Sequence, residues 1–168
     1  NRAVSYWQEG DGKFSNAFHN VYTVGDGGIM TTVKDAAKWI MNFYNPKVGD
    51  MHDIEALTTT GLLKNGKKLS YAAGIRVGHE SGWKVYSHAG GLHGYSAIIS
   101  IYPELKTGFI IFGNMRRGDI NSKVNELAKL IVTPKQAGVK GTPQVSRNYE
   151  RHHKDSVFLK SYSGDFIS

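Results

Sequence analysis

The sequence contains no cysteine, and it has no apolar run long enough to cross a membrane. The lack of cysteine excludes a disulfide framework, a cysteine-based metal site and a cysteine nucleophile, while leaving the redox compartment open. No signal-peptide pattern is present either, and the first residue is Asn1 rather than an initiator methionine. We therefore expect the chain to be one part of a larger protein.

Acidic residues are outnumbered, with 14 Asp and Glu against 21 Lys and Arg, which gives a net charge of +7. The basic residues are spread along the chain, and the densest mixed cluster, 147–154, lies in a polar segment. Neither a base-stacking motif nor a recognition helix accompanies the charge, so we do not expect nucleic-acid binding. The length of 168 residues and a hydrophobic content of 40% suit one domain with a core.

Two segments show the periodicity of amphipathic helices, 33–44 and 120–131, and a short helix is expected at 52–58. Thr32 and Asp35 resemble a capping box, Asn45-Pro46 stops the first long helix, and Asp119 caps the second. The residues expected to face the core are Val33, Ala36, Ala37, Ile40, Met41 and Tyr44, and then Ile120, Val124, Leu127, Ala128 and Ile131.

Four apolar runs are expected to form strands, and they occupy 71–77, 83–87, 95–102 and 109–113. Their connections are too short for parallel crossovers, so neighbouring strands must be antiparallel. The sequence therefore predicts an α+β fold, in which an antiparallel sheet is covered by helices within a domain spanning 1–133. We also expect a large apolar surface to remain open on this domain.

The most informative stretch is 86–91, Tyr-Ser-His-Ala-Gly-Gly, in which small residues end one apolar run before Gly94 opens the next. A strand with reduced side chains lets another group lie against its backbone. This pattern predicts a sheet edge that holds a substrate.

The order and spacing of these residues resemble the serine β-lactamase and penicillin-binding-protein family, in which a Lys-Thr-Gly or His-x-Gly triplet on an edge strand walls the active site. The triplet here is His88-Ala89-Gly90, in the histidine form of the esterase, D-aminopeptidase and carboxypeptidase-like branches. Segments 24–35 and 62–74 resemble two further motifs of the same family, "GDGGL-x-TT-x-x-D" and "L-x-dG-x-x-l-x-Y-x-x-G". The resemblance covers residues 21–132 and implies the C-terminal part of a β-lactamase-like domain.

Beyond residue 133 the apolar periodicity disappears, and 134–156 has the composition of a linker. Residues 157–168 resemble the "L-x-x-Y-x-G-x-Y" opening of a small barrel domain that is appended to many family members. The resemblance therefore implies a chain that is cut at both ends.

The family attacks its substrate with the serine of a Ser-x-x-Lys at a helix start, and no credible counterpart is present. Ser81 and Lys84 have the right spacing but follow a turn and run into a strand, where they do not share a face. Thr31 to Lys34 has helical spacing, but a threonine there is more often a cap, and Ser146-Arg147-Asn148 lies in the linker. Lys106-Thr107-Gly108 spells the lactamase triplet but follows a turn, so we interpret Lys106 as a solvated turn lysine.

The resemblance assigns catalytic roles to His88 and Gly91 and substrate-binding roles to Ala89, Gly90 and His93. The N–H of Gly91 would form half of an oxyanion hole, and Gly90 would leave room for a substrate backbone. His88 would donate a hydrogen bond or a positive charge towards the substrate or a catalytic tyrosine. A histidine loses its charge near neutral pH, which favours esterase or peptidase specificity over penicillinase chemistry.

A structural interpretation stands beside each of these assignments. His88 could be a strand-end histidine that hydrogen-bonds a loop, and His93 a solvated turn residue. A metal site on this histidine pair lacks a carboxylate or a third ligand, so neither a metal nor another cofactor is expected.

Two function classes remain. In the first, the chain belongs to a serine hydrolase acting through an acyl-enzyme on peptide, ester, D-amino-acid amide or lactam substrates, and is inactive without an N-terminal part of the same protein. In the second, it is a non-catalytic β-lactamase-like module that binds a peptide or a cell-wall ligand. The family resemblance suggests a periplasmic or extracellular location.

Overall fold

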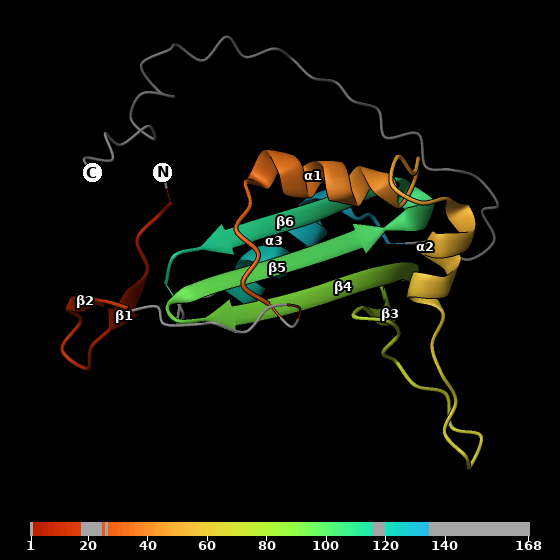
Figure 1. Ribbon diagram of the computed structural model, residues 1–168, viewed down its shortest axis with the longest axis horizontal. Helices are drawn as coiled ribbons and strands as arrows, with labels where there is room; N and C mark the ends of the chain where they lie inside the picture. The colour runs from red at the N-terminus through yellow and green to blue at the C-terminus, as the bar shows by residue number, and fades with distance from the viewer. Residues whose placement is uncertain (1, 18–24, 26, 116–119, 135–168) are drawn as a thin grey trace, which may run out of the picture.

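The computed structural model describes residues 2–17, 25, 27–115 and 120–134. Its centre is a four-stranded sheet in the order β3-β4-β5-β6, formed by Arg76–Glu80, Trp83–Leu92, Tyr95–Tyr102 and Thr107–Gly113 (Figure 1). All neighbouring strands are antiparallel, as the short connections require. The predicted α+β architecture with an antiparallel sheet is therefore confirmed.

Helices cover the sheet on both faces. On one face lie α1, Val33–Asn42, and α2, Met51–Thr58, while α3, Ile120–Ile131, lies behind the sheet in Figure 1. The remaining elements are a small hairpin of β1, Tyr6–Gln8, with β2, Phe14–Asn16, and a 3₁₀ turn, η1, at Pro103–Leu105. The molecule is thus three layers deep, with the sheet in the middle.

Alternation along the strands divides the core into two clusters. Ile101 lies on the α1 face beside Ile40 and Phe43, and it is 1% exposed. Tyr102, the next residue, points to the α3 face, where its ring lies 5.5 Å from that of Phe109. The indole of Trp83 also lies in this cluster and donates to the Thr133 carbonyl at 2.7 Å, which ties the start of β4 to the end of α3.

Both helices on the α1 face begin with side-chain caps. Thr32 is the N-cap of α1, and its hydroxyl oxygen accepts from the Asp35 N–H at 3.2 Å. Asp50 caps α2 in a reciprocal box with Asp53, because each side chain accepts from the other residue's backbone N–H. These caps orient the helices before the buried face begins.

The buried stripe of α1 differs from the prediction. Val33 and Met41 are 52% and 64% exposed, whereas Phe43, which was not expected in the core, is 3% exposed. The helix is rotated so that Ala36, Ile40 and Phe43 face the sheet. Ile131 at the end of α3 is also exposed, because the buried row runs through Val124, Ala128 and Val132 instead.

Three of the expected strands have other bounds, and the one expected at 109–113 begins two residues earlier, at Thr107. Only the last two residues of the run 71–77 belong to a strand, β3: the Ala72 N–H donates to the Ile75 carbonyl at 2.7 Å, and Gly74 has φ +80°, so the chain makes a tight turn before β3. β4 continues past Ser87 to Leu92, because its pairing with β5 extends to the following turn. The small residues therefore lie inside a strand and do not end it.

Several large apolar side chains are exposed among the described residues. Ile29, Val48, Leu62 and Leu130 are 87%, 72%, 69% and 82% exposed. None of the described helices is long and apolar enough to cross a membrane. The predicted cap at Asp119, almost all of linker 134–156 and the segment 157–168 lie outside the described residues.

The β4–β5 turn docks on the N-terminal hairpin. A Cβ on Gly94 would lie 2.7 Å from the Ala17 Cβ and 2.9 Å from the Tyr6 carbonyl oxygen. Nearby, the Tyr95 hydroxyl donates to the Ala3 carbonyl at 2.6 Å, and the Tyr6 N–H donates to the Asn114 carbonyl at 2.9 Å. The hairpin thus fixes one end of the sheet through contacts that only a glycine at position 94 permits.

Gly94→Ala should destabilise the fold more than Gly66→Ala. Both glycines have φ +80°, so both substitutions carry the left-handed backbone penalty of about 1–2 kcal/mol. Only at Gly94 does the added methyl group also collide with other atoms, since no described atom lies within 4 Å of a Cβ on Gly66. Urea unfolding of both variants measures the difference, and equal losses would contradict the docked turn.

Tyr102→Phe should make the stability of the protein fall less steeply at alkaline pH. Burial, reinforced by the hydrogen bond to Glu80, raises the pKa of the Tyr102 hydroxyl above its ordinary value of 10.0. The unfolded chain therefore releases this proton first, so the contribution of this hydroxyl to the free energy of unfolding is constant below pH 10 and falls as the pH rises above it. Burial also raises the pKa of the Tyr44 hydroxyl.

Urea unfolding at several pH values between 9 and about 12 tests this expectation. The Phe variant should be less stable at neutral pH, by about 1.5–3 kcal/mol for the lost bond to a charged group, but its stability should fall less steeply above pH 10. Tyr44→Phe should flatten the curve in the same way. A slope unchanged in both variants would show that these hydroxyls do not control alkaline unfolding.

Candidate active site at the open edge of strand β4

Strand β4 is longer than its neighbour β3, and the difference leaves part of one edge free. β3 pairs with β4 only from Glu80↔Trp83 to Arg76↔Ser87. On the opposite side, β5 pairs with β4 as far as Leu92↔Tyr95. Among the described residues, β4 therefore has no strand partner on its β3 side from His88 onwards.

The turn after β4 determines which backbone groups point to this free edge. His93 and Gly94 have φ +43° and +80°, the signature of a two-residue type I′ turn, so Leu92 and Tyr95 form the first hydrogen-bonded pair. Because bonding alternates along an antiparallel pair, Gly90 and His88 also direct their N–H and C=O groups towards β5. Residues 89 and 91 direct theirs towards the free edge.

The second turn gives the same alternation independently. Ser81 and Gly82 connect β3 to β4 with φ +52° and +84°, so Glu80 and Trp83 form a hydrogen-bonded pair. Two-residue steps from Trp83 lead to Ser87 on the β3 side, and then to residues 89 and 91. The Gly91 N–H therefore points to the β3 side of β4, where no described strand pairs with it.

The side-chain surface around this edge is almost bare. Ala89, Gly90 and Gly91 are all exposed, and no described atom lies within 4 Å of a Cβ built on Gly90. A Cβ on Gly91 would meet only the Tyr95 carbonyl oxygen, at 3.7 Å. An extended chain can therefore approach the edge without meeting a side chain from these residues.

His88 lies on the α1 face of the sheet, in the row that contains Tyr86 and Gly90. Its cross-strand neighbour is Ile99, and its Nε2 lies 2.8 Å from the Tyr71 hydroxyl. The structural interpretation of His88 expects a hydrogen bond to a loop, and the bond to Tyr71 agrees with it. However, His88 is exposed and lies within β4 rather than at a strand end. The hydrogen bond leaves the ring available to a ligand.

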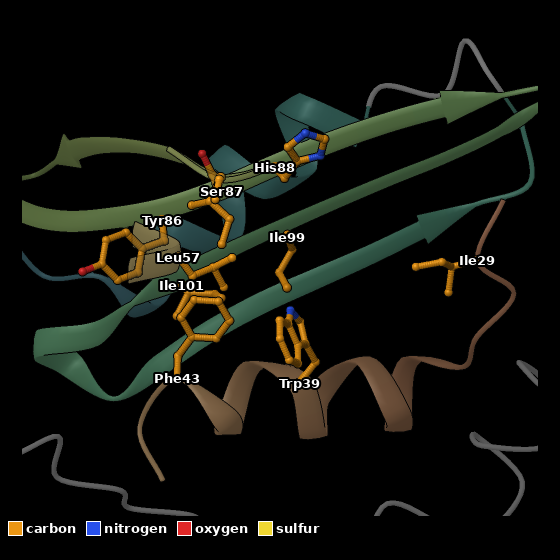
Figure 2. Close-up of a pocket in the computed structure, with 12 residues that line it drawn as sticks. Ile29, Trp39, Phe43, Leu57, Tyr86, Ser87, His88, Ile99 and Ile101 are labelled. Atoms are coloured by element: carbon orange, nitrogen blue, oxygen red, sulfur yellow. The ribbon is translucent and has the colours of Figure 1, made fainter. Parts of the chain in front are cut away.

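A cavity of about 340 Å³ lies beside His88, between α1 and the sheet. Figure 2 shows Trp39 and Phe43 projecting from α1 towards the sheet, with Ile99 and Ile101 between them and the β4 side chains. Tyr86, Ser87 and His88 line it along β4, and the rest of the lining is mostly apolar. The site therefore combines a polar strand edge with an adjoining apolar recess.

His93 is separated from the other predicted site residues. It occupies the β4–β5 turn, about 16 Å along the strand from His88 at the usual rise per residue. Its position fits a turn residue, and this distance prevents the two imidazoles from sharing one ion. The structure thus brings together His88, Ala89, Gly90 and Gly91, but not His93.

The segments that imitate family motifs have other structural roles. Ser81 lies in the β3–β4 turn and Lys84 on a strand, so they do not share a helical face. Thr32 rather than Thr31 caps α1. Lys106 is exposed in a left-handed conformation after η1, which confirms it as a turn residue. Ser146-Arg147-Asn148 lies outside the described residues.

Metal-ligating side chains come together at one place in the described part of the chain, at Asp50, His52 and Asp53. All three are exposed, and the two carboxylates are already engaged in the α2 capping box. This cluster caps a helix and lies apart from the β4 edge.

Sequence reasoning overlooked Tyr71, Trp39 and Phe43 as members of the site. Tyr71 belonged to a recognised motif, but its proximity to His88 depends on the turn before β3, which the apolar run concealed. Trp39 and Phe43 are aromatic residues one helical turn apart, with ring centroids 5.5 Å apart. That spacing was the one signal in the sequence that could have indicated an aromatic pair beside the site.

Neither a protein-family model nor a curated protein matches this chain. Its candidate function therefore depends on the motif resemblance and on the geometry of the β4 edge.

Proposed function

We propose that this chain forms the sheet wall of the active site in a serine hydrolase of the β-lactamase and penicillin-binding-protein type. The observation that carries the proposal is the edge of β4 beyond Ser87, where Gly91 directs its backbone N–H away from β5 and no other described strand pairs with it. The bare surface at Gly90 supports it, because a substrate backbone needs room beside the strand. The enzyme would act on peptide, ester, D-amino-acid amide or lactam substrates.

In this mechanism a serine outside the chain attacks the substrate carbonyl, and an acyl-enzyme forms as the leaving group departs. A lysine and a tyrosine, also outside the chain, move the protons. The Gly91 N–H donates to the oxygen as negative charge develops on it, and the N–H of the serine completes the oxyanion hole. Water then releases the acyl group, and no cofactor takes part.

His88 contributes to the same site from the α1 face. Its ring is exposed and lies beside the cavity, so it can donate a hydrogen bond to a substrate or to the catalytic tyrosine. A histidine in place of a lysine removes the permanent cation that would face a penicillin carboxylate. This replacement favours esters and peptides as substrates.

The N-terminal part of the same protein is the partner that we propose for the exposed apolar surface near the cavity. In the family that the motifs resemble, a helical region encloses the active site against this sheet. Ile29, Trp39 and Met41 are 87%, 44% and 64% exposed, which is costly for large apolar side chains without a partner. The family resemblance suggests a location in the periplasm or outside the cell.

A non-catalytic module that binds a peptide or a cell-wall ligand is the second candidate. The free edge of β4 can add a peptide strand without any nucleophile. The nearest Ser-x-x-Lys, at Ser81, also has a turn conformation unsuited to catalysis. A Ser-x-x-Lys at a helix start in the rest of the protein would favour the enzyme, and its absence the binding module.

The isolated chain should form no covalent adduct with a fluorophosphonate or a penicillin probe. Gly91 can stabilise an oxyanion, but no described serine has a lysine one helical turn away to take its proton. Mass spectrometry after incubation measures any increase in mass. A stoichiometric adduct on Ser81 would overturn our interpretation of that turn.

Gly91→Pro should abolish the response of the β4 edge to a peptide that ends in D-alanyl-D-alanine. In the unmodified chain, titration with this peptide should shift the amide NMR signals of Ala89 and Gly91 more than those of residues paired with β5. Proline removes the donor at position 91. In the protein that also holds the nucleophile, loss of this donor should lower turnover about 100- to 1000-fold.

Gly91→Ala is the matched control because it keeps the N–H. A methyl group there meets the Tyr95 carbonyl oxygen at 3.7 Å, an ordinary contact, so the fold should be unaffected. Circular dichroism confirms that both variants are folded. Equal peptide responses or equal turnover in the two folded variants would show that Gly91 is not the donor.

A further inference from the structure

We propose that Tyr71 is a positioning residue for His88, whose imidazole it holds in a single tautomer and orientation. The Tyr71 hydroxyl donates to Nε2, so the neutral ring carries its proton on Nδ1. The contact is independent of any activity, whereas the role of Nδ1–H as the donor to a ligand rests on the proposed function.

The contact has the geometry of a full hydrogen bond. The Tyr71 hydroxyl oxygen lies 2.8 Å from the His88 Nε2, and the ring centroids are 6.0 Å apart at 53°, so the rings meet at an angle without stacking. Tyr71 is 44% exposed. A tyrosine so exposed contributes little to the core, so we assign its role to the hydroxyl group.

Both backbones that carry this pair are anchored. Tyr71 forms an antiparallel bridge with Arg76, and the adjacent Val77 N–H donates to the Ser70 carbonyl at 2.8 Å. Arg76 in turn pairs with Ser87, the residue before His88. The turn before β3 therefore brings the Tyr71 side chain to His88 by a short path of backbone hydrogen bonds.

The 2.8 Å contact fits either direction, and the proposed one, from the phenol to the imidazole, is the one that the chemistry of the two groups favours. A phenol is a strong donor, and the unprotonated nitrogen of a neutral imidazole is a strong acceptor. The hydrogen bond made by one ring nitrogen determines where the proton of a neutral histidine resides. With Nε2 accepting from Tyr71, the ring retains one donor, the Nδ1–H.

A ligand gains from this restriction. An unrestrained exposed histidine exchanges between two tautomers and two ring orientations, and it presents a donor from a given nitrogen only part of the time. A fixed ring avoids the entropy of ordering when a ligand binds. Tyr71 thus prepares His88 as a neutral hydrogen-bond donor, in a position where the related lysine triplet would present a cation.

Long-range ¹H–¹⁵N correlation spectra of the labelled chain test the contact directly. At a pH of about 8.5, where an ordinary histidine is neutral, the unmodified protein should show His88 mainly as the Nδ1–H tautomer. Tyr71→Phe should shift it towards the Nε2–H form, which histidine side chains favour in water. The spectrum of His88→Asn identifies the resonances.

Tyr95→Phe is the control, because it also removes one hydroxyl, which bonds the Ala3 carbonyl at the other end of the sheet. It should leave the His88 tautomer unchanged. A predominant Nε2–H form in the unmodified chain, or the same His88 spectrum in Tyr71→Phe, would overturn the proposal. So would an equal shift in the Tyr95 variant.

A second measurement separates this proposal from the proposed function. Tyr71→Phe should weaken binding of the D-alanyl-D-alanine peptide about fivefold, the usual effect of one net hydrogen bond, without changing the thermal unfolding midpoint by more than a few degrees. A tautomer shift with unchanged peptide affinity would overturn the positioning role. If neither protein binds the peptide but the tautomer shifts, the proposed function fails while the control of His88 by Tyr71 stands.

Discussion

The pairing of β4 with β5 through to Leu92 is the constraint on which the rest of the site depends. The type I′ turn at His93 and Gly94 sets its register, and Gly94 packs so closely against the N-terminal hairpin that no side chain would fit there. Once the register is fixed, alternation decides that the Gly91 N–H faces outwards. A slip of one residue would turn this donor towards β5 and move His88 to the α3 face.

The same alternation explains why a polar edge and an apolar recess lie side by side. Tyr86 and His88 share a face with Ile99 and Ile101, which are covered by α1 further along the sheet. Since α1 lies mainly over β6, the part of this face near β4 is not filled by helix side chains, and a cavity remains. Burial in the two clusters holds this arrangement, and Phe43 and Ile101 belong both to the α1-side cluster and to the cavity wall.

Much of the fold follows from the sequence because its signals are local. Helix α3 has the predicted bounds, and β5 spans the predicted run, since periodicity and flanking turn residues define both. The rotation of α1 could not be predicted in this way, because Val33 and Phe43 are both apolar and only packing on the sheet selects between them. The run 71–77 was misjudged because its apolar residues outweighed Gly74, whose positive φ turns the chain.

The site was predictable in part for a similar reason. Small residues at 89–91 indicate a bare strand whatever the surroundings, but the free edge results from the difference in length between β3 and β4. That difference depends on the turn before Arg76, and the same turn brings Tyr71 to His88. The sequence pattern predicted a sheet edge here, but the single misread turn concealed how the edge arises and which residue contacts the histidine.

An unprotected strand edge is itself an argument for an occupant. Proteins usually shield free edges with charged side chains, proline, bulges or a covering segment, because unpaired N–H and C=O groups promote aggregation. The other edge strand, β6, is partly shielded where Tyr44 bonds the Thr107 carbonyl and where Tyr6 bridges to Met115 just beyond it. From Ala89 to Gly91, β4 has none of these devices on its own side chains, and its glycines favour close approach. The proposed function would account for this edge, because a bound substrate backbone would take the place of a covering segment.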